Sequence, residues 1–465
     1  MSPTESNSTQ AVSVERHGIA YASEDQRYGS PRNQFTIRFS PVIYLAGIFV
    51  GATGGALGLG LWGSITAIIA GNLFGAIGTG LCALMGPKLG MPQLPMGRAP
   101  FGYRGNVLPA ALSVVVYIGY YTVGTVLGGK SLADLFNTPY QPMIVLVALL
   151  SIVIGIYGYH MLHVFGQWIT YISVVMLAVV TVYMFAHGSG PGAESTLAGS
   201  GFWTIWMVQF TVVLGYTVSW SPYASDYSRF LPRRTSSWSV FGYATSGLFV
   251  ATTWMMILGA ALISLDPDGD VIDAFGIALP EPLRYVVLLV LGLAAIPHNS
   301  VNLYSGAMAV LTCDLRIKQA VIVAVGGILG GVLALAIGGS SFADHFSTFL
   351  HVISYYIMPW LAVLAVSYFK VYKNGNAFPP SSEFYAPGGA FSGTNWTGMG
   401  AFLAGVVVSV PFMANEFFTG PIAAQWNDID FSYFVSGAVA ATVYAVLARP
   451  VPARASEQET SNQPS

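Results

Sequence analysis

A cluster of polar side chains lies in the run HNSVNLYSG, residues 298–306, inside an otherwise apolar stretch of the chain. His298, Asn299 and Asn302 are costly to place in hydrocarbon, because an unpaired amide there costs on the order of several kcal/mol. They therefore need hydrogen-bond partners, either on neighbouring helices or on a ligand. A side-chain amide donates and accepts at once, so it suits the N–H/C=O edge of a planar heterocycle.

Aromatic rings lie at a similar depth in two other apolar stretches. Tyr120 has space beside it at Gly124, and the other stretch carries Tyr216, Thr217, Ser219 and Trp220. Stacking on such rings contributes roughly 1 kcal/mol or more per ring. We place no lysine, arginine, aspartate or glutamate at the midpoint of these stretches, so the pattern predicts a neutral, planar, polar ligand.

The composition defines the class of protein that must position these residues. Of 465 residues, 54% are hydrophobic and 8% are charged, whereas a soluble protein has about a quarter charged residues. So few charges cannot cover an aqueous surface. The composition predicts an all-α polytopic membrane protein and excludes a soluble enzyme, a nucleic-acid binder and a disulfide-rich secreted domain. The HExxH motif of metalloproteases is absent, so we expect no enzyme activity and no cofactor.

Apolar runs of about 20 residues predict twelve transmembrane helices. Their expected limits are 41–61, 63–85, 107–129, 141–159, 164–187, 202–225, 240–265, 283–312, 319–339, 346–370, 398–415 and 431–448. The segments 86–106 and 266–282 each predict a short surface helix between two spans.

Basic residues give an independent prediction of the topology. If the N-terminus is cytoplasmic, all of the 18 lysines and arginines except Lys130 and Arg284 fall on the cytoplasmic side. This positive-inside bias predicts a multi-pass cell-membrane (plasma or inner membrane) protein with both termini in the cytoplasm. The polar segments 1–38 and 449–465 predict disordered cytoplasmic termini.

Two interrupted spans predict an inverted repeat. The first span contains six glycines between Gly47 and Gly60, and the sixth is broken between Gly215 and Pro222. Corresponding breaks in two oppositely oriented halves point to the central site of a secondary transporter. We therefore expect a transport core at 39–397, in which one repeat covers 39–188 and the other 200–371 before a cytoplasmic loop. Helices 11 and 12 would follow at 398–448.

Four stretches carry a resemblance to a known family. They are GNLFGAIGTGLCALMGPKLGMPQLPMGRAPFGYRGN (71–106), IGYYTVGTVLGG (118–129), SWSPYASDYSRFLP (219–232) and HNSVNLYSG. Together they resemble the purine-cytosine permease branch of the nucleobase:cation symporter-1 family, in matching order from about residue 35 to 370. The resemblance implies the inverted five-plus-five (LeuT-like) transporter fold, with a substrate between aromatic side chains of spans 3 and 6 and amides of span 8.

The resemblance also implies roles for individual positions. Tyr120 falls where the family usually has tryptophan, and Gly124 falls where this branch often has asparagine. His298 replaces the first of two paired asparagines, whereas Asn299 and Asn302 match. Asp226 with Arg229 resembles a cytoplasmic gate or a helix-end ion pair.

A coupling cation is expected between spans 1 and 8. Sodium is the only metal ion considered, and a proton is the alternative. The candidate cation-binding residues are Gly47, Val50, Gly51, Ala295, His298 and Asn299.

The expected function is import of a nucleobase such as cytosine or a purine by cation symport with alternating access. The alternatives are a hydantoin, allantoin, a vitamin precursor, or a zwitterion or quaternary amine bound by cation–π contacts. The expected partners are this small molecule and the lipid bilayer, without nucleic acid, and a single chain suffices for the mechanism.

Overall fold

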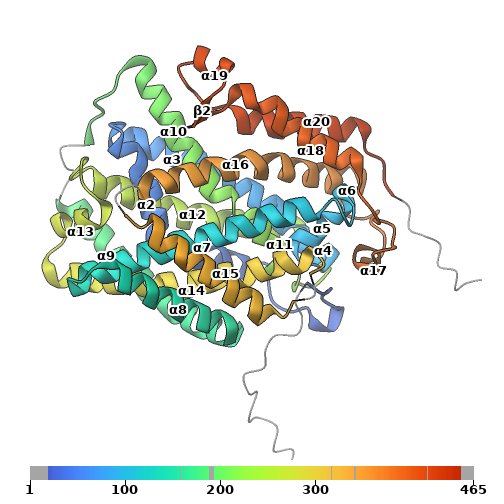
Figure 1. Cartoon of the computed structure of the whole chain (residues 1–465), viewed down its shortest axis with the longest axis horizontal. Coiled ribbons are helices and arrows are strands. Elements are labelled where there is room, and N and C mark those ends of the chain that lie inside the picture. Colours follow the sequence, from blue (N-terminus) through green and yellow to red (C-terminus); the bar gives the residue numbers. More distant parts are fainter. Residues whose placement is uncertain are drawn as a thin grey trace, which may run out of the picture.

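The computed structural model describes residues 19–157, 159–187, 193–315, 317–339, 342–415 and 417–451. Most of these residues are helical (Figure 1), as expected for an apolar chain whose backbone groups must be satisfied within each membrane-crossing segment. The described strands form one antiparallel ribbon of β1 (Ala414–Asn415) and β2 (Phe418–Thr419). The fold is therefore an all-α bundle, as predicted.

Each predicted span overlaps an apolar helix of the structure. Within the described ranges, eight segments are long and apolar enough to cross a membrane, or nine if one bent pair is counted as a span. These eight are α3 (Gly60–Ala83) continuing into α4 (Gly86–Leu89), α7 (Val107–Phe136), α9 (Tyr159–His187), α10 (Gly199–Val218) continuing into α11 (Ala224–Ser228), α12 (Ser237–Ile263), α14 (Glu281–Thr312), α15 (Gln319–Ile337) and α16 (Phe342–Val366) with the π-helical turn η5 (Ser367–Val371).

Three shorter apolar helices overlap the remaining predicted spans 4, 11 and 12. They are α8 (Tyr140–Tyr157), α18 (Trp396–Ser409) with the 3₁₀ turn η6 (Val410–Phe412), and α20 (Ser432–Leu447). Because their length does not establish a membrane crossing, the total of twelve spans stays a prediction.

The first span is broken, but not where its glycines predicted. α1 (Asn33–Phe39) and η2 (Ser40–Val42) meet α2 (Leu45–Ala56) at a bend of 67°. α2 then runs without interruption past Gly51, where an added Cβ would lie 1.9 Å from the Met256 carbonyl oxygen of α12. The absent side chain at Gly51 therefore permits close helix packing, and the break at residues 43–44 follows the proline of η2.

The sixth span is interrupted where the sequence predicted. α10 ends at Val218, and the 3₁₀ turn η4 (Ser221–Tyr223) separates it from α11. Pro222 in this turn has no backbone N–H to continue an α-helix. Backbone groups are thereby released at the centre of the bundle.

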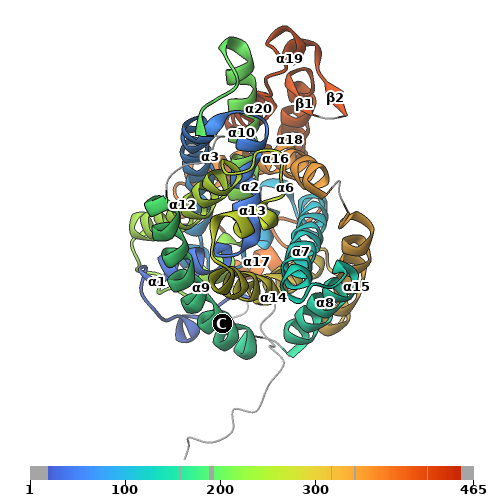
Figure 2. The ribbon, with the colours of Figure 1, turned by 90° about the vertical axis from the view of Figure 1, so that its left-hand side faces the viewer.

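The helix contacts repeat as an inverted duplication requires. In an inverted duplication, span 1 (α2) is equivalent to span 6 (α10), and span 2 (α3) is equivalent to span 7 (α12). The contact of α2 with α12 therefore corresponds to the contact of α10 with α3. In the same way, α7 (span 3) is equivalent to α14 (span 8), and α8 (span 4) is equivalent to α15 (span 9). The packing of α14 on α8 therefore corresponds to that of α7 on α15, and α7 and α14 pack on each other. Figure 2 shows α7 and α14 between α2 on one side and α8 on the other.

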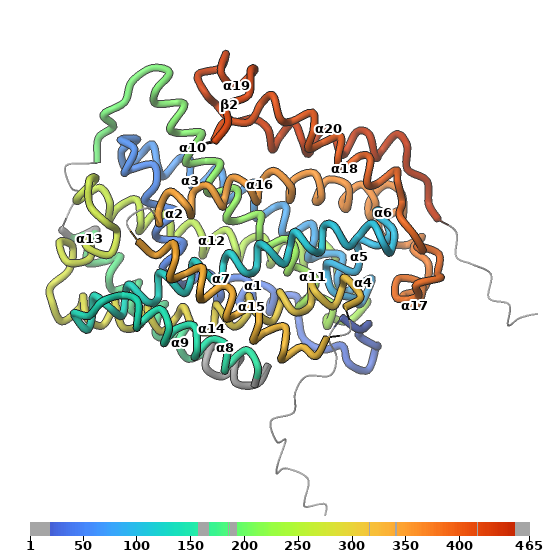
Figure 3. The backbone as a smooth tube through the Cα atoms, viewed as in Figure 1, coloured from blue at the N-terminus to red at the C-terminus, as the bar shows by residue number. Residues whose placement is uncertain are grey.

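The short elements gather at the two ends of the bundle. α4, α5 (Gln93–Met96), α6 (Arg98–Phe101) and α17 (Ser381–Tyr385) lie at one end, and α13 (Val271–Ala278) lies at the other (Figure 3). The predicted helices of 86–106 and 266–282 are thus present, although residues 89–102 are buried rather than at the surface. α18 and α20 pack on each other and on α16 along one side of the bundle (Figure 1). α19 (Pro421–Gln425) lies in the connection between α18 and α20.

The predicted disorder of residues 1–38 is wrong for 19–38. This segment carries η1 (Glu24–Gln26) and α1, and the side chains of Arg27 and Arg38 are buried. Burial is possible because main-chain carbonyls accept hydrogen bonds from both guanidinium groups. The Pro87 carbonyl accepts from Arg27, and the Ala224 carbonyl accepts from Arg38. The rest of the predicted disordered termini, 1–18 and 452–465, lies outside the described residues.

Candidate functional site

The two interrupted spans meet α7 and α14 at a buried cluster of rings and amides. Tyr44, at the first break, lies face to face with His298 of α14, with ring centroids 3.8 Å apart and planes 23° apart. His298 Nδ1 lies 2.9 Å from the Pro41 carbonyl oxygen. A carbonyl can only accept, so Nδ1 carries the proton and His298 donates this bond. The histidine thereby joins α14 to the last turn before the break.

Asn302 connects the same histidine to the second break. Its Nδ2 lies 3.0 Å from His298 Nε2, and its Oδ1 accepts a hydrogen bond of 2.6 Å from the Tyr223 hydroxyl. With Nδ1 protonated, Nε2 is the acceptor of the neutral imidazole. His298 and Asn302 therefore bridge the broken parts of spans 1 and 6, which places both at the centre as predicted.

Aromatic rings form the walls of this cluster. Tyr120 packs edge to face on Tyr216, with centroids 5.9 Å apart, and on Phe349 of α16, with centroids 5.3 Å apart. The Ser219 hydroxyl donates to the Tyr120 hydroxyl at 2.7 Å. Trp220 stands edge-on to His298 at 6.0 Å. The predicted residues Tyr120, Tyr216, Ser219 and Trp220 are thus brought together and buried.

Sequence reasoning missed three members of the cluster, Tyr44, Tyr223 and Phe349. Tyr223 packs edge to face on Tyr117, with centroids 4.6 Å apart. Tyr44 and Tyr216 are buried, and neither hydroxyl has a hydrogen-bond partner among the described residues. Tyr44 follows Pro41 by three positions, and an aromatic residue shortly after a helix-breaking proline was the available signal. Phe349 gave no signal, because span 10 shows no break.

Three predicted binding residues face away from this centre. Thr217 donates to Asn72 Oδ1 of α3 at 2.5 Å. Asn299 donates from Nδ2 to Thr125 Oγ1 at 2.9 Å, and an added Cβ at Gly124 would lie 2.1 Å from Asn299 Oδ1. Gly124 therefore provides the space in which the Asn299 amide packs against α7.

The predicted cation-binding set is dispersed in this conformation. Gly47 and Gly51 face α12, where added Cβ atoms would approach Met255 and Met256. The Val50 carbonyl accepts from Gln209 Nε2 at 3.0 Å. Ala295 packs against Gly128 of α7. Of the six residues, His298 bonds to the Pro41 carbonyl just before the break of span 1, and an added Cβ at Gly47 would lie 3.9 Å from the Val42 carbonyl oxygen.

The predicted gate residues lie at the end of the bundle that carries α4 to α6. Asp226 Oδ1 accepts from the Gln93 backbone N–H at 3.0 Å. Arg229 donates to the Ala20 carbonyl at 2.9 Å and lies over the Phe230 ring. Both residues therefore tie the end of span 6 to other segments at this end of the bundle.

The segment 19–32, here called the N-terminal strap, spans this end. Its backbone bonds to Gly90 through Ala22 N at 2.7 Å and to Phe230 through Tyr28 N at 2.6 Å. The Tyr385 hydroxyl of α17 donates to the Ile19 carbonyl at 2.7 Å. The strap thereby joins segments that follow spans 2, 6 and 10.

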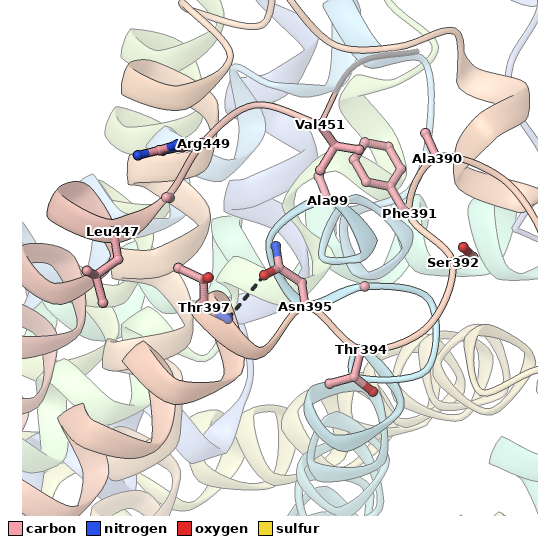
Figure 4. A pocket seen from close by; sticks show the side chains of 12 residues that line it. Ala99, Ala390, Phe391, Ser392, Thr394, Asn395, Thr397, Leu447, Arg449 and Val451 are labelled. Carbon is pink, nitrogen blue, oxygen red and sulfur yellow. Dashed lines mark hydrogen bonds between the residues drawn. The ribbon is translucent and has the colours of Figure 1, made fainter. Parts of the chain in front are cut away.

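A separate surface pocket lies near α6 and the ends of α18 and α20 (Figure 4). Asn395 Oδ1 accepts from the Thr397 backbone N–H at 3.1 Å, so Asn395 caps α18. None of the predicted site residues lines this pocket. Across the described residues, no group of three or more His, Cys, Asp or Glu side chains has the arrangement of a metal site.

An inverted-repeat bundle with two interrupted spans around a buried, uncharged, ring-lined centre defines a secondary transporter. The chain belongs to the family described as permease for cytosine/purines, uracil, thiamine, allantoin, whose model matches residues 21–436. It is therefore a membrane transporter and not an enzyme.

Relatives and solved structures agree with this assignment. The chain is 28% identical over 452 residues to the putative purine-cytosine permease YxlA of Bacillus subtilis, covering 94% of this chain and 97% of that protein. It is 24% identical to the purine-cytosine permease FCY2 of Saccharomyces cerevisiae, covering 79% and 73%. The closed structure of Mhp1, a nucleobase-cation-symport-1 family transporter with bromovinylhydantoin bound, has 18% identity and a TM-score of 0.75, covering 93% and 95%. This last likeness shows the fold.

Proposed function

We propose that this chain imports a nucleobase, such as cytosine or a purine, by cation symport with alternating access. The proposed class of substrate is supported by the position of the Asn302 amide. This amide lies between the rings of His298 and Tyr223, where the two breaks meet. Every side chain that forms this centre is uncharged. An amide among stacked rings matches the hydrogen-bonding edge and the flat face of a neutral heterocycle.

Substrate binding follows from the side chains that surround Asn302. Tyr120 and Trp220 supply ring faces. Asn302 supplies a hydrogen-bond donor and an acceptor once its hydrogen bonds to His298 and Tyr223 are broken. The alternating movement places spans 1, 2, 6 and 7 against spans 3, 4, 8 and 9. The end with α4 to α6 faces the cytoplasm, because the basic residues concentrate there.

The coupling ion is sodium or a proton. One positive charge that moves down a potential of about 100 mV supplies roughly 2.3 kcal/mol, which supports an accumulation of about 50-fold. Sodium would be held by backbone oxygens near the break of span 1 together with α14. Uptake with and without sodium, measured alongside proton flux in the native chain and in His298→Asn, distinguishes the two ions.

A thermal-shift screen of the purified protein tests the substrate class. The panel contains cytosine, adenine, uracil, a hydantoin, allantoin, a vitamin precursor and betaine, each with and without sodium. A ligand at 100 times its Kd stabilises the folded chain by about 2.7 kcal/mol. We expect a nucleobase to give the largest shift. Stabilisation by betaine alone would replace this proposal with a quaternary-amine carrier.

A further inference from the structure

The two half-helices beside the breaks are joined to each other outside the central cluster. α2 begins directly after the break of span 1, and α10 ends directly before the break of span 6. α2 and α10 pack against each other, and α2 also contacts α13. The two halves of the repeat therefore meet a second time, on the α13 side of the centre.

Gln209 of α10 makes two hydrogen bonds to the backbone of α2. Its side chain is fully buried. Nε2 donates to the Val50 carbonyl at 3.0 Å, and Oε1 accepts from the Gly54 backbone N–H. In a regular α-helix each N–H pairs with the carbonyl four positions earlier, so Val50 and Gly54 are the two ends of one helical step. The amide therefore fixes both the height and the rotation of α2 relative to α10.

These two bonds resist separation of the helices. If α2 moved away from α10, both polar atoms of the buried Gln209 side chain would lose their partners, and a buried polar group without a partner is strongly unfavourable. Gly54 provides the space for this contact, because an added Cβ there would lie 2.9 Å from Gln209 Oε1. The pair formed by Gln209 and the Val50–Gly54 step thus combines close approach with directional bonds.

The contact of α2 with α12 is of a different kind. Gly51 of α2 and Gly259 of α12 let the two backbones approach, since an added Cβ at either position would collide with the carbonyl of Met256 or Ile48. Packed helices of this kind can slide over each other by small amounts. Close packing on α12 alone would therefore leave α2 free to shift along its axis, whereas the Gln209 bonds prevent it.

Gln209 also lies apart from the bonds that a substrate would break. Along α10 it precedes Tyr216 by seven residues, which corresponds to about 10 Å at 1.5 Å per residue. A substrate on the Asn302 amide would replace the bonds that join the two breaks through His298 and Tyr223. The bonds from Gln209 to α2 are unaffected by that exchange.

We propose that Gln209 is a positioning residue that makes α2 and α10 change position together when the carrier alternates between its two states. This inference deepens the proposed function and rests on it. While the central bonds are broken, the Gln209 amide keeps the two half-helices in register. The α13 side of the site therefore opens and closes in one movement.

Turnover per binding site tests this role. Radiolabelled cytosine is the probe, with adenine and uracil as alternatives, for equilibrium binding and for uptake into proteoliposomes. The maximal uptake rate is divided by the number of binding sites, so misfolded molecules are not counted. Gln209→Met keeps the length of the side chain but removes both hydrogen bonds. We expect the turnover to fall about tenfold, while the Kd stays within about twofold because Gln209 does not contact the centre.

Thr211→Val is the matched control. Thr211 is also buried on α10, and its hydroxyl bonds to the Tyr433 hydroxyl of α20 at 2.8 Å. The variant removes a buried bond between helices from the same part of α10 without changing the contact with α2, so its turnover is expected to stay within about twofold of the native value. An equal fall in both variants would overturn the proposal, as would native turnover in Gln209→Met.

A second variant decides the question if Gln209→Met gives no molecules that bind the probe. Gly54→Ala retains the Gln209 amide, but the new Cβ would lie 2.9 Å from Oε1 and displace the amide from α2. We expect a lower turnover with an unchanged Kd, and native turnover in Gly54→Ala would then overturn the proposal. If the native chain neither binds nor carries any of the three probes, the proposed function fails instead.

Discussion

Tyr223 donates its hydroxyl to Asn302 Oδ1 at 2.6 Å, and this bond ties the interrupted sixth span to α14. The same Asn302 amide holds His298, which in turn holds the Pro41 carbonyl. Two side chains on α14, Asn302 and His298, therefore connect both breaks of the bundle. A substrate that uses the Asn302 amide must displace Tyr223 or His298, which links binding to the position of both broken spans.

Removal of the Tyr223 hydroxyl tests this competition. Tyr223→Phe keeps the ring on Tyr117 but leaves Asn302 Oδ1 open to the substrate. One hydrogen bond contributes about 1 kcal/mol, so we expect cytosine to bind about fivefold more tightly in equilibrium binding measurements. Tyr223→Ala, which also removes the ring, is expected to bind no more tightly than the native chain. Weaker binding by Tyr223→Phe would mean that the hydroxyl itself contacts the substrate.

Gly124 tests the packing of Asn299. In Gly124→Ala the new Cβ would lie 2.1 Å from Asn299 Oδ1, so the amide must move and its bond to Thr125 is strained. We expect the free energy of unfolding to fall by about 1–3 kcal/mol, measured by thermal unfolding in detergent. Gly242→Ala on α12 meets nothing within 4 Å and serves as the control, with a gain of up to about 1 kcal/mol. Equal stability of the two variants would contradict this account.

The N-terminal strap depends on Arg27. Its buried guanidinium donates to the Pro87 carbonyl at 2.7 Å and to Ala22 at 3.0 Å. Arg27→Ala removes both bonds, so limited chymotrypsin cleavage after Tyr28 is expected to become at least about tenfold faster, because bonds to the strap are lost. The exposed Arg32 provides the control Arg32→Ala, whose cleavage rate should match that of the native chain. Unchanged cleavage of Arg27→Ala would show that the backbone bonds alone hold the strap.

Asp273 of α13 gives the chain a pH dependence at the opposite end. Burial and then the neighbouring carboxylates of Asp270 and Asp134 raise the pKa of Asp273 above its usual value, against the effect of Arg284. A raised pKa in the folded chain means that stability decreases as the pH rises from the unfolded-state pKa through the folded-state value. We therefore expect Asp273→Asn to be more thermostable than the native chain at pH 7. The difference should disappear below the unfolded-state pKa, and its persistence there would exclude ionisation as the cause.

The amino-acid sequence by itself determined the class of fold. Low charge and long apolar runs require helices that satisfy their own backbone. The break near Pro222 was visible because proline lacks the backbone N–H of an α-helical hydrogen bond and here follows glycine and serine residues. That His298 and Asn302 would have buried partners also followed from local cost, since polar side chains in an apolar span need hydrogen bonds. These inferences depend on properties of single residues and on short spacings.

Only the tertiary structure decided which partners those residues find. The glycines of span 1 predicted a break, yet Gly51 allows α12 to approach, because a missing side chain serves close packing as well as bending. The break lies instead beside Tyr44, whose stacking on His298 joins residues 254 positions apart along the chain. Likewise, Asn299 is next to His298 but faces α7, since adjacent residues on a helix point about 100° apart. Contacts between distant segments, which no local pattern specifies, thus set the geometry of the centre.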